Sequence, residues 1–341
     1  MRKSIIALGL ISFYSHAELS ISGIIDLNIE SISSEGKTIQ RISGGGLSTN
    51  RIQFNWKETI NENIKINAVY EAMYSPHTND PVGTREGYLQ LISQEWGTLS
   101  LGRQDTPSAA IYGYADPLFG NDYSVVNNVG VFYAPWREDK SLLYISPRKS
   151  GFQLRAMATS GNEDDNQDGR VYSIGIDYWN NSPWYFGAAV DRKYQVNIHD
   201  DEQMEHSNDI YLSTVYSFEK TDLMMIYHHY QGYYAYPPYV DFNSRGHDLQ
   251  LGVRHNFKEK HNLGLSLIYK DDFKQDALSD AIGINLGYIY NLSDKADLYG
   301  IIGYVHHRQD SEVRYPISWN AGNPLSDENP GGIQLGMRYR F

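Results

Sequence analysis

Apolar and polar residues alternate with a period of two in many short segments of this 341-residue sequence. One such segment is IQLGMRYRF at residues 333–341, which ends on the aromatic residue Phe341. The same alternation occurs over residues 52–57, 172–178, 249–257, 263–269 and 282–290. Because successive side chains of a β-strand point to opposite faces, this period is typical of strands with one apolar and one polar face. The sequence therefore predicts an all-β fold.

The connections between these segments are of two lengths, which alternate along the chain. Short connections lie at residues 58–63, 93–98, 146–151, 180–183, 218–222, 257–261 and 292–297. Long connections lie at about residues 33–49, 74–84, 104–140, 160–169, 192–208, 231–246, 270–281 and 307–331. Seven short and eight long connections join sixteen strands.

An even number of antiparallel strands, with short turns at one end and long loops at the other, is typical of outer-membrane barrels. The mean hydropathy is −0.50. No stretch of the chain reaches the roughly 18 continuous apolar residues that a transmembrane helix needs. Lipid cannot satisfy backbone amides, so such a chain can cross a membrane only as a closed barrel. We therefore predict a transmembrane antiparallel β-barrel of about 16 strands. A secreted β-sandwich or propeller is the alternative.

The first residues indicate export. A basic pair at residues 2–3 precedes an apolar run at residues 5–14 and small residues at positions 15 and 17. This order is typical of a secretory signal peptide, and an apolar run this short does not span a bilayer. We expect residues 1–17 to be removed and residues 18–341 to form one domain. Removal would make the formal charge of −12 more negative by two.

The composition excludes several classes of function. Nucleic acid is an improbable partner for so acidic a chain. The chain has no cysteine, so neither a disulfide nor thiol chemistry is available. Its 28 tyrosines and 30 glycines favour many short strands joined by turns.

The third long connection differs from the others. It mixes apolar residues, among them Ile111, Leu118 and Phe119, with several glycines. A barrel of about sixteen strands is too wide for side chains to fill, and it leaves an aqueous channel. We therefore predict that this loop folds inward against the wall.

Six stretches resemble the trimeric general-diffusion porins of Gram-negative outer membranes. They are SISGIIDLNIE, NRIQFNWKET, REGYLQLISQEWGTLSLGRQDTP, DPLFGND, LSDKADLYG and GMRYRF. The resemblance spans essentially all of the chain after residue 17. It implies a cell outer membrane location and a water-filled channel for passive diffusion of small hydrophilic solutes and ions. It also implies a homotrimer and contact with lipopolysaccharide, and neither a cofactor nor a reaction.

In that family, basic residues of the wall face acidic residues of the inward loop across the narrowest point. Arg51, Arg85 and Arg137 match the positions of the wall arginines, and Asp116 and Asp122 lie at the tip of the loop. The resemblance therefore implies a pore constriction made by these five residues. The alternative is that the arginines are ordinary lumen residues with no effect on selectivity.

The sequence departs from the family pattern at two positions. Leu118 stands where a glutamate is frequent, and Ile24 stands where some members have a lysine. The alternation also leaves the orientation of Arg103 open.

The resemblance implies that Phe341 is a signal for assembly into the membrane.

Other motifs support weaker hypotheses. The segment DDNQDG at 164–169 begins like a calcium loop, but Gly175 replaces the glutamate that a helix-loop-helix site requires, so a polar hairpin loop is favoured. The tyrosine-rich residues 227–242 suit either a sugar-stacking platform or an aromatic girdle, and we favour the girdle. The histidine pairs 228–229 and 306–307 cannot chelate one ion, because neighbours on a strand face opposite ways. No metal site is predicted.

Three alternative functions are compatible with a barrel. One is a channel that prefers a substrate such as an oligosaccharide. The second is a barrel enzyme, for which HDDE at residues 199–202 supplies suitable residue types. The third is a structural or adhesive barrel. Ion conductance distinguishes a channel from the last two.

Overall fold

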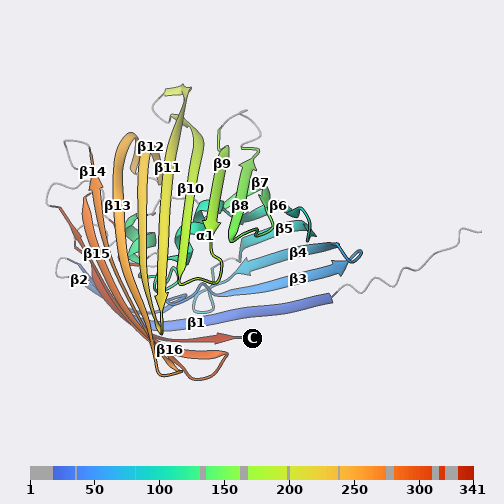
Figure 1. The fold of residues 1–341 in the computed structure, drawn as a ribbon. Coiled ribbons are helices and arrows are strands. Elements are labelled where there is room, and N and C mark those ends of the chain that lie inside the picture. The colour runs from blue at the N-terminus through green and yellow to red at the C-terminus, as the bar shows by residue number, and fades with distance from the viewer. Residues whose placement is uncertain are drawn as a thin grey trace, which may run out of the picture.

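The computed structural model describes residues 18–34, 37–80, 82–130, 136–161, 168–197, 200–236, 239–273, 280–308, 315–318 and 329–341. Its strands form one sheet that curls around a central space (Figure 1). They are β1 (Glu18–Ser34), β2 (Lys37–Gly44), β3 (Arg51–Thr59), β4 (Ile64–Met73), β5 (Gly83–Ser93), β6 (Gly97–Asp105), β7 (Arg137–Ile145), β8 (Phe152–Thr159), β9 (Val171–Tyr178), β10 (Trp184–Asn197), β11 (Asp200–Phe218), β12 (Thr221–Tyr236), β13 (Tyr239–Phe257), β14 (His261–Asp272), β15 (Ala281–Asn291), β16 (Ala296–His307) and β17 (Gly331–Arg340).

Two short helices, α1 (Pro107–Tyr114) and the π-helix η1 (Val126–Gly130), lie between β6 and β7. Neither they nor any other helix in the described ranges is long and apolar enough to cross a membrane.

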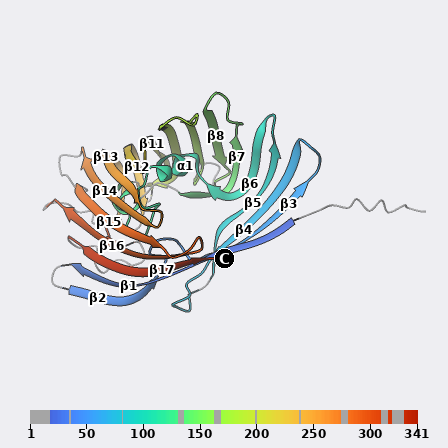
Figure 2. The same ribbon diagram turned by 60° about the horizontal axis from the view of Figure 1, so that its bottom comes forward.

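The sheet closes on itself through its first and last strands. Strand β17 pairs antiparallel with β1, from Ile24 opposite Arg340 to Ser33 opposite Gly331. From β3 to β17, each strand pairs antiparallel with the next. The result is a closed antiparallel barrel (Figure 2), and the predicted fold class is confirmed.

Strands β2 and β3 together occupy one position in the barrel. Strand β2 pairs with the second half of β1, and β3 pairs with the first half. The seventeen strand segments therefore fill sixteen positions, which agrees with the predicted number. The first long connection, expected at residues 33–49, thus contains a strand. Residues 45–50 separate β2 from β3 and interrupt the pairing of this position with β1.

A buried aspartate stabilises the conformation of residues 45–50. Asp26 lies in β1, and its Oδ2 atom accepts the backbone N–H groups of Leu47 at 3.0 Å and Ser48 at 2.8 Å. Its own N–H donates to Oδ1 of Asn50 at 2.5 Å. Gly45 has a φ of 78°, a left-handed conformation that glycine adopts without steric cost. The Asp26 side chain thus supplies acceptors for two of the N–H groups of residues 45–50 that make no strand hydrogen bond.

All seven predicted short turns lie between paired strands, but two further long connections, besides the first, are wrong. Residues 192–208 were expected to be a loop, yet β10 continues to Asn197 and β11 begins at Asp200. Residues 231–246 are likewise mostly the ends of β12 and β13. Both hairpins continue the pairing beyond the alternating segments, because backbone hydrogen bonds between strands do not require an apolar face.

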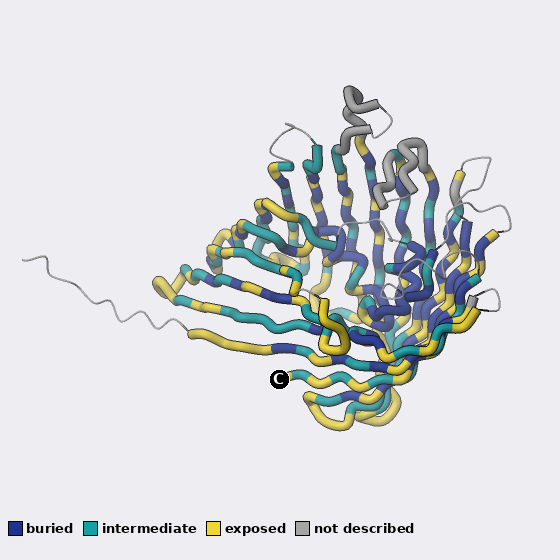
Figure 3. Tube along the Cα trace, turned by 180° about the vertical axis from the view of Figure 1, so that it is seen from behind, coloured by how far each residue is buried: buried dark blue, intermediate teal, exposed yellow. Residues whose placement is uncertain are grey.

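The two faces of the barrel differ as the alternation predicts. In β15, the side chains of Ile282, Ile284 and Leu286 are exposed on the outside, whereas Asn285 and Ile289 are buried. Figure 3 shows this alternation of exposed and buried residues along many strands. Exposed apolar side chains would contact lipid, and polar and small side chains would face the interior.

Candidate functional site

The segment between β6 and β7 begins with a capped helix that packs on the wall. Oγ1 of Thr106 accepts the N–H of Ala109 at 3.1 Å, and Pro107 occupies the first turn, where its missing N–H has no cost. Ile111 and Tyr112 have no exposed surface. Oγ of Ser213, in β11, donates to the carbonyl of Ile111 at 3.0 Å. Figure 2 shows α1 within the ring of strands.

The remainder of the segment crosses to other strands of the wall. Nζ of Lys270, in β14, donates to the carbonyl of Gly130 at 3.1 Å. The hydroxyl of Tyr123 donates to Glu30 of β1 at 3.0 Å. These contacts attach the segment to widely separated strands, so that its position is fixed from several directions.

The tip of the segment exposes one aromatic ring. Leu118 is buried, as expected, but Phe119 is 61% exposed. Phe119 has a φ of 57°, which is uncommon for a residue with a side chain. Its ring lies over the guanidinium of Arg254, with 4.5 Å between the ring centroid and Cζ.

Two of the three predicted wall arginines share one carboxylate. Arg51 lies at the start of β3 and Arg85 lies in β5, on either side of β4. Nε of Arg51 lies 3.4 Å from Oε2 of Glu71, and Arg85 donates to the other oxygen of the same carboxylate. Gln53 also donates to Glu71, at 3.1 Å.

The third arginine extends the same network. Nε of Arg137, at the start of β7, lies 3.2 Å from Glu86 and 2.9 Å from Asp105. Glu86 also lies 3.6 Å from Nη1 of Arg85. The structure therefore brings all three predicted arginines into one continuous set of ion pairs, which we call the arginine cluster. Its members are Arg51, Arg85, Arg137, Glu71, Glu86 and Asp105.

The three carboxylates of the cluster were missed by the sequence analysis. With three arginines and three carboxylates, the cluster has a formal charge of zero rather than +3. The side chain of Glu71 is only 5% exposed, whereas those of Arg51 and Arg85 are 26% and 20% exposed. The alternation in β4 could have revealed Glu71, because the neighbouring Tyr70 is exposed on the outer face.

Arg103 lies apart from this cluster and pairs with Asp139 at 2.9 Å. The pairing of β6 with β7 shifts register between Gly102 and Gln104. This irregularity explains why simple alternation does not orient Arg103.

The two predicted loop aspartates are buried. Asp116 is 1% exposed, and its carboxylate accepts the N–H groups of Leu118 and Gly120, each at 3.0 Å, and the hydroxyl of Ser124 at 2.5 Å. Burial raises the pKa of the Asp116 carboxyl, although these hydrogen bonds act in the opposite direction. These three hydrogen bonds lie within its own loop, while Arg254 of β13 acts on it electrostatically. Its role in ion selectivity stays a prediction.

Asp122 has a similarly enclosed position. Its side chain accepts the hydroxyl of Ser318 at 2.7 Å, and its N–H donates to the carbonyl of Gly46 at 2.9 Å. It thereby joins the loop to the interruption between β2 and β3. The structure does not bring Asp116 or Asp122 into ion pairs with the arginine cluster among the residues it describes, and the effect of Asp122 on ions likewise stays a prediction.

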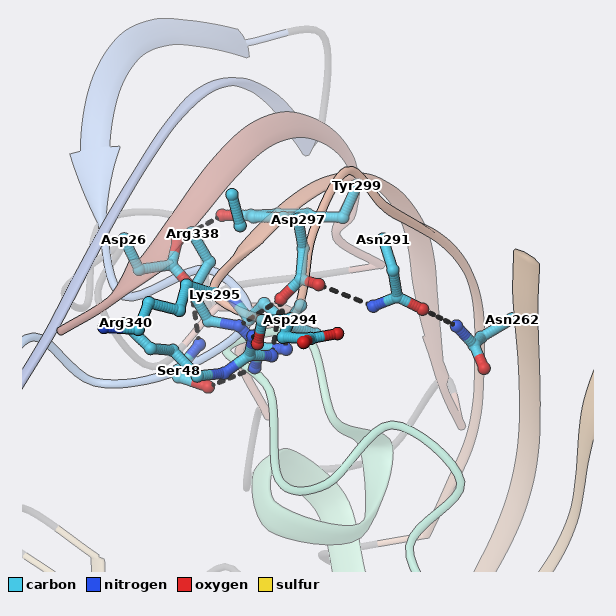
Figure 4. A network of polar contacts seen from close by, with 12 residues as sticks. Asp26, Ser48, Asn262, Asn291, Asp294, Lys295, Asp297, Tyr299, Arg338 and Arg340 are labelled. Carbon is cyan, nitrogen blue, oxygen red and sulfur yellow. Dashed lines mark hydrogen bonds and ion pairs between the residues drawn. The ribbon is translucent and has the colours of Figure 1, made fainter. Parts of the chain in front are cut away.

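Phe341 completes the pairing of the last strand with the first. Its N–H and carbonyl exchange hydrogen bonds of 3.1 and 3.0 Å with Gly23. The neighbouring Arg338 and Arg340 both donate to Oδ2 of Asp297, at 2.7 and 2.5 Å (Figure 4). The arginines of this strand face the interior, and the apolar residues Met337 and Tyr339 are exposed on the outer face.

Several sequence hypotheses fall on residues outside the described ranges. The signal peptide at residues 1–17 is one, and most of the calcium-like segment at 164–169 is another. The side chains of residues 199–202 and of 233–244 are likewise not described. His228 is described, and it lies buried between Asp209 and Asp248, with contacts of 3.1 and 2.9 Å.

Comparisons with known proteins agree with this architecture. A family model described as Gram-negative porin matches residues 4–310. No curated protein sequence is significantly similar to the chain. The anion-selective porin from Comamonas acidovorans has a similar structure, with a TM-score of 0.81 and 18% identity over 95% of this chain and 100% of that one.

Two further solved structures share the fold at lower scores. OmpF of Salmonella typhi, in complex with daunomycin, has a TM-score of 0.72 and 13% identity over 95% of this chain and 98% of its own. OmpT of Vibrio cholerae, in a trimer form, has a TM-score of 0.66 and 14% identity over 95% of this chain and 99% of its own. At these identities the similarity establishes the fold alone.

Proposed function

The chain belongs to the Gram-negative porin family, and from this premise we propose that the arginine cluster forms the charged side of the narrowest part of its channel. As a member of this family, the protein is an outer-membrane β-barrel that allows small solutes to diffuse passively. The observation that carries the proposal is the convergence of Arg51, Arg85 and Arg137, from three different strands, on shared carboxylates. The proposal includes no reaction and no cofactor.

The exposed fractions of the side chains suggest how the cluster acts on ions. Glu71 is more deeply buried than Arg51 and Arg85, so a passing ion approaches these two guanidinium groups more closely than their carboxylate, whereas at Arg137 the partner Asp105 is the more exposed group, at 48% against 13%. A unit charge about 5 Å from an ion contributes roughly 0.8 kcal/mol even at the dielectric constant of water. We infer that the cluster attracts anions locally, although its carboxylates weaken the effect. The negative charge of the whole chain acts at the channel mouths and is screened over about 10 Å.

Removing the three arginine charges tests this proposal. In the Arg51→Ala/Arg85→Ala/Arg137→Ala variant, the zero-current potential in a salt gradient should move toward cations. The matched control removes Arg148, Arg155 and Arg308, which pair with other carboxylates. The control changes the net charge equally, so a general field effect would shift both variants alike. An unchanged potential in the first variant, or equal shifts in the two, would place the constriction elsewhere.

We further propose that residues 1–17 are removed on export and that the mature barrel begins at Glu18 and assembles as a trimer in contact with lipopolysaccharide. The family membership and the trimer form of the similar OmpT support the trimer. The basic pair, apolar run and small residues within positions 1–17 support the cleavage. Intact-mass measurement of outer-membrane protein tests the cleavage, and cross-linking in native membranes tests the trimer.

A further inference from the structure

A pocket of about 360 Å³ lies between the loop tip and the barrel wall. The loop contributes Pro117, Leu118 and Phe119, and the wall contributes arginines and asparagines of β13, β14, β15 and β17. The pocket volume is near the lower end of the range for small-molecule sites, roughly 300–1,000 Å³. No residue of the arginine cluster lines the pocket, so it is separate from the proposed constriction.

Among the direct ion pairs at this pocket, the guanidinium groups outnumber the carboxylates by one, and the buried Asp116 and Asp26 also act electrostatically on Arg254 and Arg338. Nε and Nη2 of Arg254 donate to Oδ2 of Asp222, at 3.0 and 2.8 Å. Arg338 and Arg340 share Asp297, whose side chain has no exposed surface (Figure 4). Three guanidinium groups thus face two carboxylates. An excess of one charge suits a monoanion.

One donor of the Arg254 side chain lacks an acceptor among the described residues. Its Nη1 atom is buried and makes no hydrogen bond to any residue that the structure describes. A buried N–H without an acceptor is energetically costly, so an added acceptor would be favourable at this atom. Nε and Nη2 already donate to Asp222, which fixes the plane of the guanidinium.

An apolar surface lies next to this donor. The Phe119 ring stacks on the Arg254 guanidinium and is nevertheless 61% exposed. Its left-handed backbone conformation is held by the turn in which Asp116 accepts the N–H of Gly120. Leu118 and Ile289 add buried apolar atoms to the lining. One side of the pocket is therefore cationic and the other is apolar.

We propose that this pocket binds small organic monocarboxylates that carry a ring or a short apolar body. The carboxylate accepts from Nη1 of Arg254, and the apolar body contacts the Phe119 ring. A carboxylate matches the planar guanidinium and the single excess charge, whereas a dianionic phosphate would remain partly uncompensated. The pocket then acts as a weak binding site for such solutes during their passage.

Calorimetric titration of the folded, detergent-solubilised protein with benzoate tests the proposal without requiring conductance. Benzoate should bind, and benzamide, its neutral analogue, should bind at least about tenfold more weakly because a charge-assisted hydrogen bond is lost. Acetate should bind more weakly than benzoate, and phenyl phosphate should not bind more tightly than benzoate.

Three variants locate the binding site. Arg254→Gln should weaken benzoate binding about tenfold. Phe119→Ala should weaken benzoate binding about fivefold and leave acetate binding unchanged, since only benzoate has a ring to stack. Arg155→Gln is the matched control, because Arg155 pairs with Asp177 elsewhere on the wall, and it should leave the affinity unchanged.

The results that would contradict the carboxylate pocket differ from those that would contradict the proposed constriction. Absence of benzoate binding, equal binding of benzamide, or equal affinity in wild type and Phe119→Ala each contradicts it. Phe119 is exposed, so its variant folds even if Arg254→Gln does not, and it then decides the question. Zero-current potentials of the arginine-cluster variants are unaffected by any of these results.

Discussion

Leu118 fills the space in which a Cβ atom at Gly264 would lie, since its Cδ2 would be only 2.4 Å from that atom. Gly287 pairs with Gly264 across β14 and β15, and a Cβ atom there would lie 2.7 Å from the same methyl group. Pro117 approaches Gly252 of β13 in the same way. Because these three glycines have no side chains, the loop tip can lie against the wall, and we call this surface the glycine seat. The wall sequence thus helps to determine the position of the loop.

We expect the double variant Gly264→Ala/Gly287→Ala to displace the loop tip. Contacts below 3.0 Å cannot be kept, so Leu118 must move, at a cost of about 1–3 kcal/mol. Because the added methyl groups push the tip away from the wall and into the channel, single-channel conductance should fall and become noisier, and the folded barrel should lose heat resistance slightly. Gly87→Ala is the control, because a Cβ there has no neighbour closer than 3.7 Å. Conductance identical to that of wild type in the double variant would show that the glycine seat does not control channel width.

Much of the barrel could be predicted because successive side chains of every strand point to opposite faces. The alternation therefore identified the residues of the outer face, and the spacing of the alternating segments identified the short turns. The interruption at residues 45–50 could not be predicted, because it depends on Asp26, which is distant in sequence and holds it by hydrogen bonds. The ends of β10 and β12 were missed because pairing continued where the apolar pattern stopped.

The site was only partly predictable for a related reason. Resemblance identified Arg51, Arg85 and Arg137, and the structure brings them together. Their ion pairs with carboxylates depend on strand register, which β-bulges shift locally, as between Glu71 and Ala72. Asp116 lies at the loop tip as expected, but nothing in the sequence pattern reveals that its carboxylate accepts three hydrogen bonds from nearby residues of the loop.

Changing Phe341 should impair assembly more than it impairs the stability of the folded barrel. Phe341→Ser keeps both backbone hydrogen bonds to Gly23 and removes the ring at the end of the closing strand. We expect less heat-resistant protein in the outer membrane, measured by gel mobility without heating. Ile333→Ser, which removes an exposed apolar side chain from the other end of β17, is the control. Equal amounts of folded protein in both variants and wild type would argue against a special role for the last residue.

Replacing Asp116 should test whether its carboxylate holds the tip of the loop. Asp116→Ala removes the acceptor for three donors and should cost about 1–3 kcal/mol, with a noisier channel. Asp116→Asn should be milder. Burial raises the pKa of this carboxyl, which means that the site disfavours the charged form, and asparagine is neutral and keeps one acceptor oxygen. Thermal loss of the heat-resistant form and current noise measure both effects. A milder effect of alanine than of asparagine would contradict this account.

The carboxylates of the arginine cluster provide the converse test of the constriction. In Glu71→Gln/Glu86→Gln, the cluster changes from a formal charge of zero to +2, while glutamine keeps an acceptor for the arginines. The zero-current potential should therefore move toward anions, opposite to the arginine variant. One charge at about 5 Å changes a permeability ratio roughly fourfold in the absence of screening, so two charges should give a clear shift. Glu62→Gln/Glu95→Gln removes two exposed negative charges at the short turns and should shift the potential less. If both pairs of substitutions move the potential equally, ions sense the net charge of the barrel and not the geometry of the cluster.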